Sequence, residues 1–193
     1  MNLWRGSESR SGPGSSLDET AAVRAELPRI VDAYGIRSVL DIPCGDFFWM
    51  KEVPLEIAYI GGDVVKRIVD DNNRRYGSDR RRFIRLDLRV YPLPRVDLVL
   101  CRDILDHLSF SDIHGSIDNV IRSGATYLIA TTYPERDANE DIRSGDWRPV
   151  NLQREPFRLP DPIELINERS RKPGYSDKSL GLWRVAHLPR GPG

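Results

Sequence analysis

The sequence predicts an α/β fold in which a doubly wound, mostly parallel sheet carries helices on both faces. Short apolar runs alternate with amphipathic segments from residue 16 to residue 134. The central runs are apolar throughout, which is typical of strands that are covered on both sides. Several of these runs end on an acidic residue, which places carboxylates along one edge of such a sheet.

The first helix is expected to follow Ser16. Ser16 is a good N-cap residue, and Glu19 stands three positions later, as in a capping box. An apolar stripe then recurs at helical spacing until Gly35, which ends the helix.

Six apolar runs bounded by turn residues are the expected strands. They cover residues 38–42, 56–64, 81–88, 96–103, 125–134 and 179–188. Further helices are expected over residues 64–77 and 110–124, and a short helix or loop over residues 47–55. The polar, proline-rich residues 135–178 are long for a connection in a compact domain, and loops of that length are usually functional.

Bulk composition narrows the class of protein. A chain of 193 residues fits one domain spanning residues 1–193, and 29 Lys+Arg balance 29 Asp+Glu, so no global field attracts nucleic acid or a membrane. Cys44 and Cys101 each follow an apolar run, which indicates reduced, buried thiols and a cytoplasmic protein. No apolar stretch approaches the ~20 residues that span a bilayer, and the first sixteen residues lack the apolar core of a secretory signal.

The turn after the first strand, within SVLDIPCGDFFWM (residues 38–50), decides which cofactor fits. A dinucleotide site needs Gly-x-Gly-x-x-Gly there, and this turn offers only Gly45. Asp41 and Asp46 would repel a diphosphate, since two unit charges ~4 Å apart interact by ~4 kcal/mol at an intermediate dielectric. The same acids suit S-adenosylmethionine, which carries a sulfonium and an ammonium group and no phosphate. The turn therefore predicts S-adenosylmethionine rather than NAD.

Two later acids extend this interpretation. Asp63 closes the second strand 22 residues after Asp41 (63 − 41), close to the ~20 expected for an acid that binds ribose hydroxyls. Asp87 ends the third strand, where its carboxylate can accept from an adenine amino group. Any one of these acids alone would be read as a helix cap or turn residue, but three at consecutive strand ends predict a cofactor site.

These motifs resemble those of the class I S-adenosylmethionine-dependent methyltransferases. VLDIPCGD matches their first motif, YIGGDV the ribose-binding acid, RLDL the adenine-side acid and VDLVLCRDILDHL the fourth-strand motif, so the resemblance covers about residues 38–134. It implies a Rossmann-like, seven-stranded sheet whose final antiparallel strand is residues 179–188. Pro43 and Phe47 replace the outer two glycines of the first motif, which narrows the space around the methionine tail. The cofactor-binding residues implied are Asp41, Pro43, Cys44, Gly45, Asp46, Asp63, Asp87, Leu88 and Arg102.

Asp103 and His107 are the candidate catalytic residues. They follow the fourth strand four positions apart, so they share a face if the segment is helical. His107 is the preferred base because an imidazole titrates near neutral pH, and the alternative is that it caps or packs. His114 is expected to be solvated, and His187, in the last strand, to be structural.

Two segments are candidates for binding the acceptor. Residues 1–17 form either a floppy tail or a lid over the cofactor and acceptor, and Trp4 argues against a tail. Residues 135–178 combine aromatic, arginine and asparagine side chains, as sugar sites do, although a loop packed on the sheet edge would explain them equally well. The acceptor candidates are Ser11, Gly14, Ser16, Thr20, Trp147, Arg148 and Asn151.

A Mg²⁺ ion is the remaining cofactor to consider. Some methyltransferases that act on hydroxyl groups hold Mg²⁺ at carboxylates after the fourth and fifth strands, which lowers the pKa of the acceptor. The carboxylates at those positions are Asp103, Asp137, Asp141 and Asp146. Their spacing is not diagnostic, and such loop acids are usually solvated.

The sequence thus predicts an O-methyltransferase acting on a hydroxyl of a sugar or oligosaccharide. Within the family it most resembles small actinobacterial saccharide enzymes, including those that methylate mycobacterial methylmannose polysaccharide, through the SGPGSSL lead-in, the small size and the many arginines. One alternative is an RNA methyltransferase, suggested by the arginines of DRRRFIR before the third strand. Another is a non-catalytic binding protein. A homodimer is expected if the first helix and FFWM form an exposed apolar patch.

Overall fold

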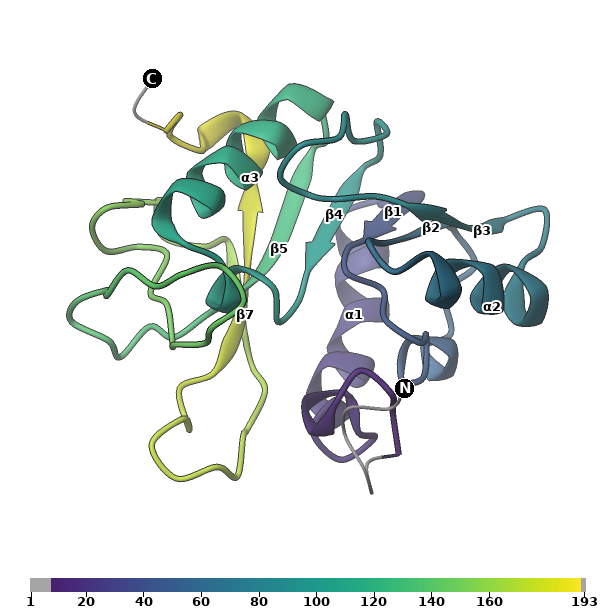
Figure 1. Cartoon of the computed structure of the whole chain (residues 1–193), viewed down its shortest axis with the longest axis horizontal. Coiled ribbons are helices and arrows are strands. Elements are labelled where there is room, and N and C mark those ends of the chain that lie inside the picture. The colour runs from purple at the N-terminus through teal and green to yellow at the C-terminus, as the bar shows by residue number, and fades with distance from the viewer. Residues whose placement is uncertain (1–7, 192–193) are drawn as a thin grey trace.

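The computed structural model describes residues 8–191, which are built around one seven-stranded sheet (Figure 1). The strand order is β3-β2-β1-β4-β5-β7-β6. The strands are β1 (Ser38–Asp41), β2 (Ala58–Asp63), β3 (Arg81–Arg85), β4 (Leu98–Cys101), β5 (Tyr127–Thr132), β6 (Glu164–Asn167) and β7 (Ser179–Arg184). The predicted Rossmann-like sheet is confirmed.

The sheet is parallel from β3 to β5, and β7 runs antiparallel to both β5 and β6. β1 lies between β2 and β4, so Asp41 at its end stands beside Gly61 on one side and Leu100 on the other. The strand order reverses between β1 and β4. In open α/β sheets, a crevice for ligands forms at that point, outside the carboxyl ends of the strands.

Helices cover both faces, as Figure 1 shows for α1 and α3. Alternate residues of the central strands point to opposite sides. Leu40 and Val99 pack with α3 (Phe110–Ser123), whereas Val39 and Leu98 pack with α1 (Ala21–Ala33). α2 (Lys66–Tyr76) packs on the same side as α1 through Val69.

The helix ends follow local chemistry. The hydroxyl of Ser109 accepts a hydrogen bond from the Asp112 amide and caps α3, which ends at Gly124 in the left-handed conformation. Ser16 accepts from the Glu19 amide at 3.3 Å, as the capping pattern predicted. The chain makes turns after this contact, however, and regular helix begins only at Ala21.

One sequence expectation about burial is confirmed and one about exposure needs correction. Cys44 and Cys101 are buried free thiols, as predicted. Phe47, Trp49 and Met50 of the FFWM stretch are buried in the core that also contains the apolar stripe of α1. The patch on which the homodimer rested is therefore not exposed, because the helix and FFWM cover each other.

The C-terminal third differs most from expectation. β6 lies inside the segment expected to be a loop, and it forms the edge of the sheet by pairing with β7. His187 lies after β7 in a 3-10 turn and is exposed, so it is not a strand residue. Within residues 8–191, no helix is both long and apolar enough to cross a membrane.

Candidate active site

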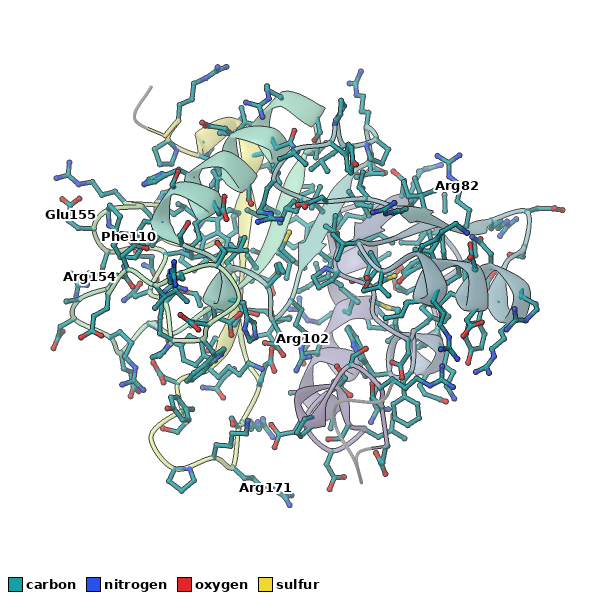
Figure 2. All side chains as sticks on the ribbon, in the orientation of Figure 1. Arg82, Arg102, Phe110, Arg154, Glu155 and Arg171 are labelled. Carbon is teal, nitrogen blue, oxygen red and sulfur yellow. The ribbon has the colours of Figure 1, made fainter. Side chains whose placement is uncertain are left out.

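A cavity of about 520 Å³ lies over the carboxyl ends of β1, β2 and β4. This volume is in the range of small-molecule sites. The N-terminal residues 11–15 and the loop between β6 and β7 complete its wall. Of the predicted cofactor residues, those that line the cavity are Asp41, Pro43, Cys44, Gly45, Asp46, Asp63 and Arg102. Figure 2 labels Arg102 near the centre of the molecule.

The turn after β1 has no free amide to offer a diphosphate. The amide of Gly45 donates to Asp63 Oδ2 at 3.2 Å, and the amide of Asp46 donates to Ser11 Oγ at 3.0 Å. The amides of residues 44, 47 and 48 also have acceptors within the protein. No α-helix follows this turn before α2, so a helix N-terminus is missing as well. The predicted exclusion of a diphosphate thus has a second basis besides charge.

Asp41 and Asp63 are the buried acids of the cofactor side. Asp41 accepts a hydrogen bond from the Tyr59 hydroxyl at 2.5 Å, and burial raises the pKa of Asp41 to about 7 despite this bond and the positive charge of Arg102. Asp63 accepts from Gly45 and from the Val65 amide at 2.8 Å. Burial also raises the pKa of Asp63.

Asp87 and Leu88 do not lie where the sequence placed them. β3 ends at Arg85, two residues before Asp87. The Asp87 carboxylate forms an ion pair with Arg89, and hydrogen bonding to Arg89 lowers the pKa of Asp87. Leu88 is part of the hydrophobic core. Neither residue lines the cavity. The apolar side chains that line it near the end of β2 are instead Val65 and Ile68.

Residues 9–11 of the N-terminal segment are hydrogen-bonded to Asp46 in the turn after β1. The carboxylate of Asp46 accepts hydrogen bonds from the hydroxyls of Ser9 and Ser11 and from the amide of Arg10. The carbonyl of Gly14 accepts from the Arg102 guanidinium at 2.9 Å. Ser11 and Gly14 therefore lie at the cavity, in the position expected of a lid.

Ser16 and Thr20 are not at the cavity. The hydroxyl of Thr20 is fully buried and donates to the Ser16 carbonyl at 2.8 Å, so it fixes the turn before α1. Ser16 lines a separate surface pocket with Arg169 and Arg171. Trp4, which argued against a floppy tail, lies outside the described residues.

Four charged side chains form what we call the buried quartet beside the cavity. Arg102, Glu168 and Lys178 are buried, and Asp103 is half-buried. Arg102 donates twice to Glu168, at 3.1 and 2.6 Å, and lies 3.0 Å from Asp103. The ammonium of Lys178 lies 2.7 Å from Asp103 and 3.2 Å from Glu168. Two positive and two negative charges thus neutralise one another inside the protein.

Asp103 is consequently a poor base. Burial alone would raise its pKa, but the charges of Arg102 and Lys178 outweigh burial and leave the pKa below its ordinary value. The helical spacing expected for Asp103 and His107 is wrong, because Asp103 has φ 53° and only residues 105–107 form a 3-10 turn. Both side chains nevertheless line the cavity.

His107 has the tautomer that a base needs. Its Nδ1 lies 2.9 Å from the carbonyl oxygen of Asp146. A carbonyl can only accept, so the proton of the neutral ring sits on Nδ1 and the lone pair is left on Nε2.

The structure adds residues that sequence reasoning missed. Asp106 lies between the two catalytic candidates in the sequence, and its Oδ2 accepts from the Trp147 indole at 2.8 Å. Other additions that line the cavity are Trp49, Tyr133, Lys172, Tyr175 and Lys178. Asp106 was visible in the motif CRDILDHL. The residues of the β6–β7 loop gave no signal, because their contacts are long-range.

Two predicted acceptor residues have structural roles instead. The buried guanidinium of Arg148 donates to the carbonyls of Leu105 and Leu108, which holds the 3-10 turn in place. The buried amide of Asn151 donates to the carbonyls of Pro134 and Arg136. Neither lines the cavity, whereas Trp147 does.

The Mg²⁺ site is not supported. Nowhere in residues 8–191 do three or more His, Cys, Asp or Glu side chains come together as metal ligands. Asp103 is paired within the buried quartet, and Asp141 accepts from the Phe110 amide. Asp137 is an exposed loop residue.

None of the arginines of DRRRFIR lines the cavity, although Arg85 stands in register with Asp63 and donates to the carbonyl of Val64 at 3.3 Å. Arg81, Arg82 and Arg85 belong to β3 rather than to the loop before it. Figure 2 shows Arg82 well separated from Arg102. The arginine patch therefore contributes no lining residue to the candidate site.

Comparisons with known proteins support the fold. Human N-acetylserotonin methyltransferase, solved with S-adenosylmethionine, aligns over 89% of this chain with a TM-score of 0.60 at 12% identity. The N-methyltransferase NodS of Bradyrhizobium japonicum WM9 aligns over 86% of this chain and 96% of its own, with a TM-score of 0.60 at 16% identity. This chain has the Rossmann-like methyltransferase fold.

The same comparisons also set limits. The chain spans 52% of the human methyltransferase chain. The [4+2]-cyclase SpnF shares the fold as well, with a TM-score of 0.56, 18% identity and coverage of 80% of this chain and 76% of its own. No family model and no curated protein matches the sequence. The methyltransferase fold thus also serves a cyclase, so function has to be argued from the site.

Proposed function

We propose that this protein is an S-adenosylmethionine-dependent methyltransferase that methylates a hydroxyl group of a small acceptor, with a sugar or oligosaccharide as the first acceptor class. One observation carries the proposal. A single cavity joins Asp41, Gly45 and Asp63 at the strand ends to His107 and Trp147 on the acceptor side. Donor and acceptor can therefore meet without solvent between them.

The residues of the cofactor side fit S-adenosylmethionine. The Asp63 carboxylate accepts backbone amides on both oxygens, and a carboxylate has about four lone-pair directions, so it can also accept from ribose hydroxyls. Val65 and Ile68 offer an apolar wall for a flat base. The carboxylates of Asp41 and Asp46 in and before the first turn favour a positively charged methionine tail. When bound, the cofactor supplies an activated methyl group on a sulfonium.

His107 would remove the proton of the acceptor. Nε2 of His107 would accept the hydroxyl proton of the acceptor as that oxygen is methylated. The carbonyl of Asp146 holds the Nδ1 proton and orients the ring. Asp103 takes no proton in this scheme, since Arg102 and Lys178 neutralise it.

A saccharide acceptor is supported by the pairing of flat rings with polar groups. The Trp147 side chain is 40% exposed and lines the cavity together with Tyr133 and Asp106. Sugar sites stack one apolar face of the ring and hydrogen-bond its hydroxyls.

Calorimetry followed by an acceptor screen tests the proposal. We expect S-adenosylmethionine to bind and NAD not to bind, and we expect transfer of a labelled methyl group to at least one saccharide. A silent titration with S-adenosylmethionine would indicate a non-catalytic protein. Methylation of phenols but of no saccharide would overturn the sugar assignment, and methylation of RNA with salt-sensitive binding would overturn the small acceptor.

A further inference from the structure

Asp106 is a buried acid that forms no ion pair among the residues that the structure describes. The residue is 3% exposed and lines the cavity. Oδ2 accepts from the Trp147 indole, but Oδ1 is buried without a hydrogen-bond partner. Buried polar atoms are nearly always satisfied, so an orphaned carboxylate oxygen on a residue that lines a ligand cavity indicates a group that arrives with the ligand.

Three aromatic rings form a cluster that contacts this carboxylate through Trp147. The ring centroids of Trp147 lie 6.4 Å from Tyr133 and 5.1 Å from Tyr175, and those of Tyr133 and Tyr175 lie 6.2 Å apart. All three side chains line the cavity. Their faces carry partial negative charge, so rings gathered near a carboxylate attract a cation.

The electrostatic balance of the cavity points the same way. The two positive and two negative charges of the buried quartet balance one another. Asp106 lies outside these ion pairs and interacts electrostatically with Arg102, Lys178 and Arg148. Burial, together with the negative charge of Asp103, raises the pKa of Asp106 to about 6, so its carboxyl group is mostly ionised above neutral pH. Burial and the negative charges of Asp106, Asp103, Glu168 and Asp177 also raise the pKa of Tyr133. The acids around Tyr133 therefore make the potential at its hydroxyl negative.

We infer that the acceptor carries an ammonium group beside its hydroxyl, and that Asp106 Oδ1 and the faces of Trp147 and Tyr133 hold that ammonium. The inference rests on the proposed function and narrows its acceptor to amino sugars and other amino alcohols. An ammonium group can donate to Oδ1 while it lies over a ring. It has no lone pair, so it is held rather than methylated, and the hydroxyl is left for His107.

Arg136 and Lys172 are cations near the rings, and their positions show which rings could hold an ammonium group. The Arg136 guanidinium lies 5.6 Å from the ring centre of Tyr175, so this ring is already in contact with a cation. Lys172 lines the cavity but is an exposed residue. Trp147 and Tyr133, next to Asp106, therefore form the inner ammonium site, and Lys172 stays at the rim.

Matched acceptor pairs test the inference on the full-length protein with saturating S-adenosylmethionine. The pairs are glucosamine against glucose and tyramine against 4-ethylphenol, with N-acetylglucosamine as the neutral amide control. We expect kcat/KM to be at least about tenfold higher for the amine in at least one pair, a ratio of the size that a desolvated cation–ring contact provides. The product should be O-methylated.

Two substitutions identify the residues responsible. Asp106→Asn keeps the shape and the bond from Trp147 but removes the charge, so the preference for the amine should fall to within about twofold. Trp147→Leu should weaken the preference through loss of the ring. The exposed Asp32 of α1 supplies the control variant Asp32→Asn, which should keep the wild-type ratio. Circular dichroism and S-adenosylmethionine affinity establish that each variant is folded.

The outcomes separate this inference from the proposed function. Equal methylation of amine and neutral acceptors, an N-methylated product, or an unchanged preference in a folded Asp106→Asn variant would each overturn the ammonium site while leaving the methyltransferase intact. If S-adenosylmethionine does not bind at all, the proposed function itself fails.

Discussion

Asp63 holds the first turn and faces the proposed ribose with the same carboxylate. Its two oxygens accept hydrogen bonds from the amides of Gly45 and Val65, and the residue also lines the cavity. Substitution of this residue should therefore weaken cofactor binding through both effects.

We predict that Asp63→Asn lowers the affinity for S-adenosylmethionine by at least about tenfold, because an amide supplies only one oxygen and no charge. Calorimetry on the purified variant measures this loss. Asp32→Asn is the matched control on an exposed face, and it should bind as the wild type does. Wild-type affinity in Asp63→Asn would exclude Asp63 from the cofactor site.

His107 is predicted to act on the chemical step alone. His107→Gln should lower kcat by roughly 10²- to 10⁴-fold, the usual contribution of a general base, while the affinity for S-adenosylmethionine stays unchanged. Single-turnover assays with the best acceptor measure the step. The exposed His187 provides the control His187→Gln. A kcat within threefold of wild type for His107→Gln would assign proton removal to another group.

At the scale of elements, the buried quartet links four distant parts of the chain. Arg102 and Asp103 follow β4, Glu168 follows β6, Lys178 precedes β7, and the Arg102 guanidinium also reaches the carbonyl of Gly14. The wall of the cavity is thus fixed by charge as well as by the sheet.

Glu168→Gln is predicted to destabilise the protein by about 3–5 kcal/mol, since it leaves Arg102 and Lys178 buried with one carboxylate between them. Urea unfolding measures the change. Glu155, which pairs with Arg158 on the surface, provides the control Glu155→Gln, and this substitution should change the unfolding free energy little because solvent screens the pair. Equal effects of the two substitutions would show that the quartet does not stabilise the fold.

Local patterns predicted the elements from α1 to β5, because apolar periodicity and glycine stops are encoded within each element. They also predicted Asp41, Gly45, Asp63 and His107 at the cavity. β6 was not predicted, since an edge strand of four residues has too little apolar pattern to stand out from a polar loop.

The remaining site errors arise where local chemistry is satisfied by distant partners. Arg148 and Asn151 were predicted to bind the acceptor, but their side chains donate hydrogen bonds to backbone carbonyls that are distant in the sequence. Asp87 was predicted to bind the cofactor, but its carboxylate forms an ion pair with Arg89. Lys178 could not be assigned, because its acidic partner Asp103 is 75 residues away.

At the scale of the whole molecule, the buried acids make stability depend on pH. The pKa of Asp41 is raised to about 7 and that of Asp106 to about 6, mainly by burial. Between pH 4 and 7 the folded protein keeps protons that the unfolded chain has released. The contribution of these groups to the free energy of unfolding therefore falls as pH rises through this window.

We predict that Asp41→Asn becomes more stable relative to wild type as pH rises from 5 to 8, because the variant has no buried charge to create. Urea unfolding of both proteins at the two pH values gives the difference. Asp87 has a lowered pKa and is already ionised at pH 5, so Asp87→Asn should show a difference that does not vary between these pH values. A flat difference for Asp41→Asn would mean that Asp41 is ionised throughout.

The placement of β7 between β5 and β6 has a consequence for biosynthesis. β5 stays without its second neighbour until residues 179–184 have been made, and Glu168 and Lys178 are also synthesised after Arg102 and Asp103. Arg102 and Asp103 in the nascent chain therefore lack their partners Glu168 and Lys178 until those residues have been synthesised. A stalled or prematurely terminated polypeptide would expose β5 as an open apolar edge, and it is this truncated form that chaperones and proteases would encounter.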